Sequence, residues 1–344
     1  MRNITNRLRS EQGGFSLVEM MISSAVTLIV LAETMTAFNH ALRAHETVTL
    51  LADSNQALRA GTAFMVRDLM MTGNGIPTGG IPIPTGPGSQ PVSRPSPPGT
   101  AYVFDANLGV LPALTPGPDL GPDVVGSTTD MVTILYEDNR LDLSQYTLTS
   151  IASDGSSMTV DARTNINNPN TRIVQGDLIM FSNALGYALR EVTRTVGQVV
   201  HFEGTDVSNL NQIGGSEGTI LQLKTGTTFP PTSAYRVKMI TYYLDKDTDP
   251  DAPRLVRQEN YWAPRAMSGA MDDLQITYDI VDGVDNPTNV DAPTGDTTPN
   301  QIRKVNLQVG VRSENETVES RKFKRGTIKT QVSLRSLAFV NRYE

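Results

Sequence analysis

The 344-residue chain contains no cysteine, one tryptophan and three histidines. Without cysteine it can form neither disulfide bonds nor thiolate metal sites, so an exported domain must be stabilised by packing alone. His40 and His45 miss by one residue the i,i+4 spacing that would place them on one helix face. No serine lies in a recognisable nucleophile setting, and no glycine-rich phosphate loop is present. The sequence therefore predicts a protein that is not an enzyme.

Basic residues are fewer than acidic ones, 29 against 36, which gives a formal net charge of −7. This acidic balance argues against a surface for duplex DNA, and we expect no nucleic-acid partner. A cluster of basic residues near the C-terminus, Lys322, Lys324, Arg325 and Lys329, alternates with Phe323 and Ile328. Such alternation is typical of the solvated face of a strand.

Long hydrophobic runs are rare, and the uncharged stretch Met20–Ala32 is the main one. A glycine pair, Gly13-Gly14, precedes it, followed by Phe15 and a single carboxylate, Glu19. The small-residue cleavage site of a secretory signal peptide would follow the apolar run, and none does. A lone ionisable residue in a membrane-bound stretch is costly without a partner, so Glu19 is predicted to be functional.

The segment Gly14-Phe15-Ser16-Leu17-Val18-Glu19 resembles the type IV prepilin cleavage and methylation motif. The resemblance implies that a prepilin peptidase cuts the Gly14–Phe15 bond and methylates the new N-terminus at Phe15. It also implies that Glu19, the fifth mature residue, acts in assembly by pairing with the amine of a neighbouring subunit.

Residues 1–14 are predicted to be a cleaved cytoplasmic leader, because its arginines outnumber its one acid and positive charge favours the inner side. Residues 15–38 form the predicted transmembrane and assembly helix. Hydroxyl residues and Glu33 interrupt this span, which makes it a marginal anchor suited to leaving the lipid for a protein bundle. We place Glu33 at the outer headgroup level.

Residues 39–72 are predicted to continue the same helix, because Ala37–Met71 contains no proline and only Gly61 weakens it. At 1.5 Å per residue, the whole helix would be about 85 Å long. One amphipathic stripe is expected to dock on the protein's own sheet: Val48, Leu51, Asn55, Leu58, Thr62, Met65 and Leu69. A second set repeats every seven residues, at Leu50, Ala57, Phe64 and Met71. It either meets other subunits, is scattered surface, or is covered by the loop that follows the helix.

Glycine and proline make up about half of residues 73–100, which predicts an irregular linker rather than a packed element. Residues 101–344 form a β-rich domain, in which Asp154-Gly155 marks a hairpin turn. The fold class is therefore α+β, with a long N-terminal helix packed on an antiparallel sheet that carries β-rich insertions. The predicted strands are Met131–Tyr136, Tyr146–Ile151, Met158–Val160, Asp177–Phe181, Tyr187–Thr193, Val199–Phe202, Ile220–Lys224, Tyr235–Leu244, Leu255–Trp262, Leu274–Ile280, Ile302–Arg312 and Lys322–Ala338.

Several segments are similar to the elements of PilW-type minor pilins and of J-type pseudopilins of type II secretion. They are Arg67-Asp68-Leu69, Gly176–Met180, Tyr242-Tyr243-Leu244, Pro253–Arg257 and Arg303–Leu307. The resemblance implies a minor pilin that helps to initiate or cap a type IV pilus. A minor pseudopilin and a tip adhesin remain alternatives. The implied partners are prepilin peptidase, other pilins, the inner-membrane assembly platform and membrane lipid. The implied location is the inner membrane, then the periplasm and cell surface.

Four carboxylates alternate in a short segment, at Asp245, Asp247, Asp249 and Asp251. Oxygen ligands at this spacing suit Ca²⁺. However, proline occupies the place of the turn glycine of a helix-loop-helix calcium site, and the flanks are predicted to be strands. The favoured interpretation is an acidic hairpin tip, with calcium as the alternative and no other cofactor expected.

Overall fold

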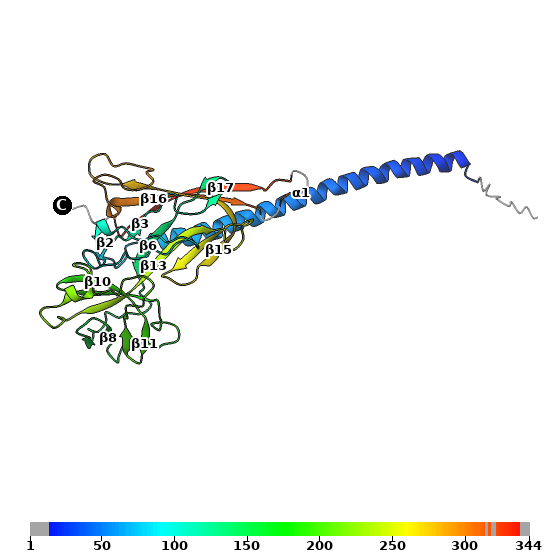
Figure 1. The fold of residues 1–344 in the computed structure, drawn as a ribbon. Coiled ribbons are helices and arrows are strands. Elements are labelled where there is room, and N and C mark those ends of the chain that lie inside the picture. The colour runs from blue at the N-terminus through cyan, green and yellow to red at the C-terminus, as the bar shows by residue number, and fades with distance from the viewer. Residues whose placement is uncertain (1–13, 314–315, 318–320, 338–344) are drawn as a thin grey trace, which may run out of the picture.

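The structure is a computed structural model that describes residues 14–313, 316–317 and 321–337. One long helix, α1 (Leu17–Met71), projects from a β-rich body, and its C-terminal part lies along that body (Figure 1). This arrangement confirms the predicted α+β class. Most of the predicted leader, including Gly13, lies outside the described residues.

Helix α1 begins and ends at the residues that its sequence favours. Ser16 is the N-cap and forms a capping box with Glu19. After Thr72 the chain turns at Gly73, whose φ of 77° lies in the left-handed region that glycine tolerates. Inside the helix, a Cβ at Gly61 would lie 2.8 Å from Cε of Met271. The helix therefore lies too close to the body at this point for a larger residue.

The buried face of α1 differs from the predicted stripe. Leu58, Thr62, Met65 and Leu69 are buried as expected, but Val48 is 65% exposed. Ser54, Gly61 and Asp68 are buried instead. Small and polar residues thus take part in the contact between α1 and the sheet. Only the C-terminal part of the predicted stripe, from Leu58 onward, is buried. In the second set, Leu50 and Ala57 border a small cavity beside Gly269 and Ala270, while Phe64 and Met71 are exposed.

The body is built on a nine-stranded antiparallel sheet with the order β10-β9-β13-β14-β15-β16-β17. Strand β6 pairs with β13 and with β3, off this path. The strands are β3 (Leu114–Thr115), β6 (Val132–Glu137), β9 (Leu178–Asn183), β10 (Gly186–Glu191), β13 (Ser233–Asp245), β14 (Arg254–Glu259), β15 (Arg265–Ile280), β16 (Ile302–Arg312) and β17 (Arg325–Ser333).

The predicted alternation of buried and exposed side chains along β16 is confirmed. Val305, Leu307, Val309 and Val311 are buried, whereas the residues between them are mostly part-exposed. Helix α1 contacts β15, β16 and β17, so the apolar side chains of these strands form the core beneath it. Main sheet and helix therefore share one hydrophobic core.

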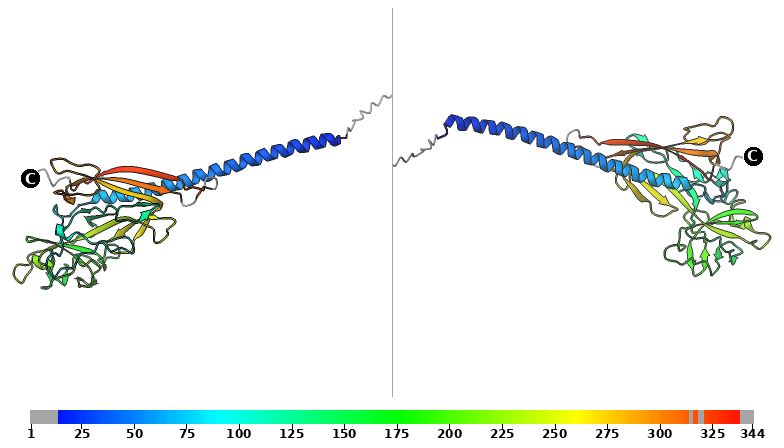
Figure 2. Two further views of the ribbon diagram at one scale, coloured as in Figure 1. Left: turned by 45° about the horizontal axis from the view of Figure 1, so that its top comes forward. Right: turned by 180° about the vertical axis from the view of Figure 1, so that it is seen from behind.

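A second lobe is inserted between β6 and β13 and has a separate core, which includes Phe181, Phe202 and Ile220. Its sheet has the order β11-β12-β8-β7. In both ribbon figures the lobe lies on the side of the body away from β17 (Figure 2). Its strands are β7 (Ser150–Ile151), β8 (Ser157–Thr159), β11 (Arg194–Val196) and β12 (Val199–His201).

Three sequence-based expectations in the body need correction. The predicted strand at residues 220–224 is the 3₁₀ helix η2 (Ile220–Leu223), which buries Ile220 and Leu223 with one turn. The predicted strand from Tyr146 is confined to β7. Residues 73–100 are irregular but packed, because Ile81, Ile83 and Val92 are buried. The remaining short elements are β1 (Ile81–Pro82), β2 (Val110–Leu111), β4 (Asp123–Val124), β5 (Ser127–Thr128), η1 (Ala106–Leu108) and η3 (Pro299–Gln301).

Candidate functional site

The predicted cleavage position lies at the free end of α1. Phe15 is 84% exposed, and a Cβ built on Gly14 would meet no atom within 4 Å. Packing within this chain therefore does not require glycine at position 14. If glycine is required there, the constraint must come from a molecule that binds this segment.

Glu19 caps its own helix. Its Oε2 accepts a hydrogen bond from the backbone N–H of Ser16 at 2.9 Å, and the Ser16 hydroxyl accepts one from Val18 N–H at 3.3 Å. The carboxylate thus lies beside the first unpaired N–H groups, where helix dipoles favour negative charge. It also lies on the same end of the helix as Phe15, whose amine would become the N-terminus after cleavage.

Four hydroxyl groups in the predicted span donate hydrogen bonds within the helix. Thr27, Thr34 and Thr36 donate to the carbonyls four residues earlier, and Ser24 donates to Met21 O. This pairing lowers the cost of placing these side chains in lipid. Glu33 lies 18 residues after Phe15, which is about 27 Å along a helix and close to the bilayer thickness of about 30 Å.

α1 is long and apolar enough to cross a membrane, and the body covers none of its most apolar window. Exposed apolar side chains surround this part of the helix on every side, among them Leu17, Met21, Val26 and Ile29. A helix that is apolar all round is stable only in lipid or against other helices. The free half of α1 therefore needs a partner that the body does not supply.

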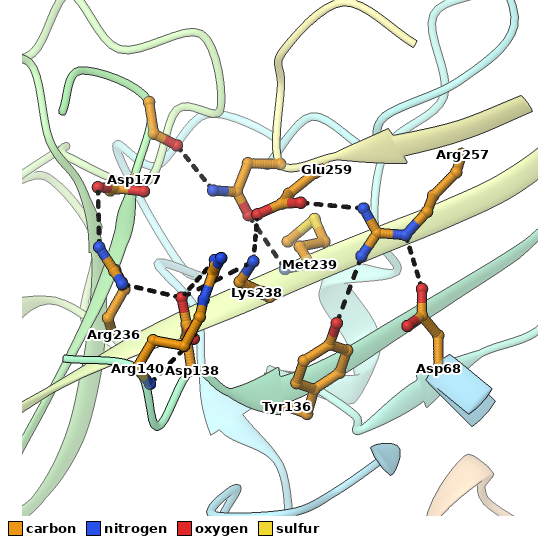
Figure 3. A network of polar contacts seen from close by, with 12 residues as sticks. Asp68, Tyr136, Asp138, Arg140, Asp177, Arg236, Lys238, Met239, Arg257 and Glu259 are labelled. Atoms are coloured by element: carbon orange, nitrogen blue, oxygen red, sulfur yellow. Dashed lines mark hydrogen bonds and ion pairs between the residues drawn. The ribbon is translucent and has the colours of Figure 1, made fainter. Parts of the chain in front are cut away.

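At the opposite end, α1 is anchored to the sheet by a buried ion pair. Arg257 on β14 donates from Nε to Oδ2 of Asp68 at 2.6 Å (Figure 3). The Tyr242 hydroxyl donates to the same oxygen at 2.8 Å. The side chains of Asp68 and Arg257 are 3% and 15% exposed. Burial alone would lower the pKa of Arg257, but the hydrogen bond that it donates to Asp68 and the charge of Asp68 outweigh burial and raise the pKa, so its guanidinium stays charged.

A chain of ion pairs continues from Arg257 toward the second lobe (Figure 3). Arg257 pairs with Glu259 at 2.9 Å, and Glu259 pairs with Lys238 at 2.6 Å. Lys238 and Arg236 both face Asp138, at 3.7 Å and 2.9 Å. Arg236 lies 3.9 Å from Asp177, which directly precedes β9. Helix, main sheet and lobe are thus joined by one polar network.

The pKa values of three acids in this network are shifted in different directions. Burial would raise the pKa of Asp138, but hydrogen bonds from Arg140 and the charges of Lys238 and Arg236 lower it. The pKa of Glu259 is lowered too, because hydrogen bonds from Lys238 and Arg257 and their charges outweigh the effect of burial. Asp177 is the exception, since burial raises its pKa to about 6 despite a hydrogen bond from Val174 N–H. Of these three acids, Asp177 gains a proton most easily.

Sequence reasoning did not single out this network. Asp68, Asp177, Tyr242 and Arg257 each lie in a segment that carries the pilin resemblance, but nothing in the sequence shows that the segments meet. A partial signal is present, because Asp68 and Asp177 each directly precede a short apolar run, at Leu69 and at Leu178. Buried charges of this kind need partners.

The acidic segment forms the connection between β13 and β14, as the hairpin interpretation predicts. The Asp245 carboxylate accepts hydrogen bonds from Asp247 N–H at 2.9 Å and from the Thr248 hydroxyl at 2.7 Å. Asp249 accepts one from Asp251 N–H at 3.1 Å. Within the described ranges, no three acidic or histidine side chains are grouped so that they could hold a metal ion. Calcium binding stays a prediction.

One serine does match a nucleophile pattern by letter, in Gly214-Gly215-Ser216-Glu217-Gly218. A nucleophile elbow requires a tight turn from a strand into a helix. Ser216 instead lies in an irregular loop, where its N–H donates to Thr85 O and its carbonyl accepts from Gln222. The match has none of the required geometry.

Comparison with known proteins identifies the N-terminus. Residues 9–32 match the family described as Prokaryotic N-terminal methylation motif. No curated protein and no solved structure matches the chain. The chain therefore carries a type IV prepilin-like N-terminus on a long apolar helix. This motif implies processing by prepilin peptidase, membrane anchoring before assembly and assembly with other pilins.

Proposed function

We propose that the chain is a PilW-type minor pilin that helps to initiate or cap a type IV pilus. The observation that carries this proposal is the prepilin-like motif at the exposed end of a helix whose free half is apolar all round. The absence of cysteine supports a minor rather than a major subunit, since many related major pilins carry a disulfide. The role is structural, with no catalytic step and no required cofactor.

Glu19 is the residue on which assembly would depend. In lipid its carboxylate has one internal partner, the N–H of Ser16, and is unfavourable without a positive charge. Cleavage after Gly14 creates the amine of Phe15 near it, and the amine of a neighbouring subunit can take the same place in a helix bundle. Pairing would draw the subunit from the bilayer into the fibre and set its axial register.

The test compares Glu19→Val with Glu19→Asp in cells that make the full chain. Glu19→Val should be cleaved and inserted as wild type but excluded from sheared fibres, and Glu19→Asp should be incorporated in part because its shorter arm misplaces the charge. The assay is the ratio of fibre-associated to processed membrane protein. Wild-type incorporation of Glu19→Val would contradict the pairing mechanism.

Two alternatives use the same N-terminus. A minor pseudopilin of type II secretion would share processing and assembly but would be encoded beside secretion genes rather than pilus genes. A tip adhesin would use the second lobe, which has its own core and lies away from β17. Binding of the full chain to surfaces, lost when the lobe alone is altered, would favour the adhesin.

A further inference from the structure

Among the strands that the structure describes, β17 is the last of the main sheet. It pairs with β16 on one side only, and within the described residues no strand pairs with its other side. The opposite end of the sheet is different, because β10 is in contact with η2 and β1. An unpaired edge is a template for another strand, so natural proteins usually shorten or cover it. At nine residues, β17 is long for an edge that remains open.

The register shows which backbone groups face outward. Leu334 N–H donates to Arg303 O, and Ser313 N–H donates to Lys324 O, so these pairs exchange hydrogen bonds with β16. Hydrogen-bonded pairs alternate in an antiparallel ladder. The even-numbered residues of β17 therefore bond to β16. The odd-numbered residues direct their N–H and C=O groups to the outer edge, where no described strand pairs with them: Arg325, Thr327, Lys329, Gln331 and Ser333.

The exposed side chains on this strand are polar and carry only positive charge. Lys329 lies at the centre of the strand, and Arg325, at its start, pairs with Asp272 on β15 at 2.6 Å. The neighbouring sheet surface is a groove of about 470 Å³ whose lining includes Gln275, Asn306 and Gln308 and no aromatic side chain. Such a surface offers hydrogen bonds but no ring on which a sugar could stack.

We propose that β17 is a docking edge for an extended, acidic strand of a different subunit in the assembly. This proposal rests on the proposed pilin function. Main-chain hydrogen bonds to the outward groups would supply affinity, and carboxylates opposite Lys329 would supply specificity. A second copy fits poorly, because antiparallel pairing centred on Lys329 would place two lysines opposite each other. The lysine thus selects against self-association and in favour of an acidic partner.

The experiment uses the full chain in cells and measures the fibre-associated share of the processed protein. Thr327→Pro removes an N–H that points away from β16, with Thr327→Ser as the matched control. Lys329→Glu reverses the central charge, with Lys329→Arg as its control. Both Lys329 variants change an exposed side chain and should fold. Loss of one ladder hydrogen bond should lower incorporation roughly fivefold for Thr327→Pro, and Lys329→Glu should lower it similarly.

The outcomes separate the two proposals. If Thr327→Pro and Lys329→Glu are both incorporated as wild type, β17 is merely a protected edge and the docking proposal is overturned. If Thr327→Pro is excluded but Lys329→Glu is not, the acidic nature of the partner is overturned. Absence of the wild-type chain itself from fibres would instead overturn the proposed pilin function.

Discussion

Asp68 holds α1 to the body, and removing its carboxylate should be strongly destabilising. In Asp68→Ala, Arg257 would keep its ion pair with Glu259 but would lose the buried carboxylate oxygen that lies 2.6 Å from its Nε. Tyr242 would lose the acceptor of its buried hydroxyl. Breaking a buried ion pair from one side costs about 3–5 kcal/mol. This is a large part of the total stability of a typical domain, which is about 5–15 kcal/mol.

The assay is urea unfolding of the full chain in detergent, followed by the fluorescence of Trp262, the one tryptophan. Trp262 lies in the body, where its indole N–H donates to Gln175 O at 3.1 Å. The matched control is Asp53→Ala, which removes an exposed carboxylate from the same helix and should change the free energy of unfolding by less than about 0.5 kcal/mol.

A double variant separates the ion pair from other effects of the substitution. Asp68→Leu together with Arg257→Met removes both charges, so it should recover more than half of the loss caused by Asp68→Ala. The reasoning is refuted if Asp68→Ala destabilises the chain no more than Asp53→Ala does. It is also refuted if the double variant is as unstable as the sum of its two single variants.

Two further predictions concern protons and calcium. Because burial raises the folded-state pKa of Asp177 to about 6 from 3.8, the folded state binds a proton more readily than the unfolded chain. Its contribution to stability is therefore complete below 3.8 and is lost as the pH rises through 6. Going from about pH 7 to about pH 5 should raise the free energy of unfolding of wild type by about 1.4 kcal/mol relative to Asp177→Asn, and equal pH profiles in urea unfolding would contradict this. If the β13–β14 connection binds calcium, a concentration of about 100 times the dissociation constant should stabilise the chain by about 2.7 kcal/mol. An unchanged melting temperature at millimolar calcium, in wild type and in Asp247→Asn alike, would leave only the hairpin.

Local patterns predicted the regular elements well. The absence of proline predicted α1 almost to its ends, and the alternation from Val305 to Val311 predicted the buried face of β16. The hairpin at Asp154-Gly155 is confirmed, since β7 and β8 pair across it and Gly155 has a φ of 74°. These features depend on neighbouring residues alone, so one sequence is enough to find them.

Features that depend on distant contacts were missed. The docked face of α1 includes Gly61 and Ser54 because close approach to the sheet selects small residues there, which hydrophobic periodicity does not count. The separate core of the second lobe and the turn of η2 likewise follow from packing between distant segments. The ion pair of Asp68 with Arg257 joins residues 189 positions apart, which no local pattern could reveal.

The processed N-terminus decides the central claim that this chain is an exported, pilin-like subunit. Gly14 and Phe15 lie within the matched motif and are free of contacts that would hide them. The measurement is mass spectrometry of the N-terminal peptide of the chain purified from membranes and from sheared fibres. The account predicts one peptide that begins with methylated Phe15, and retention of the leader when Gly14 is replaced by a bulky residue. Mature protein that begins at any other residue, or fibre-associated protein that still begins at Met1, would contradict it.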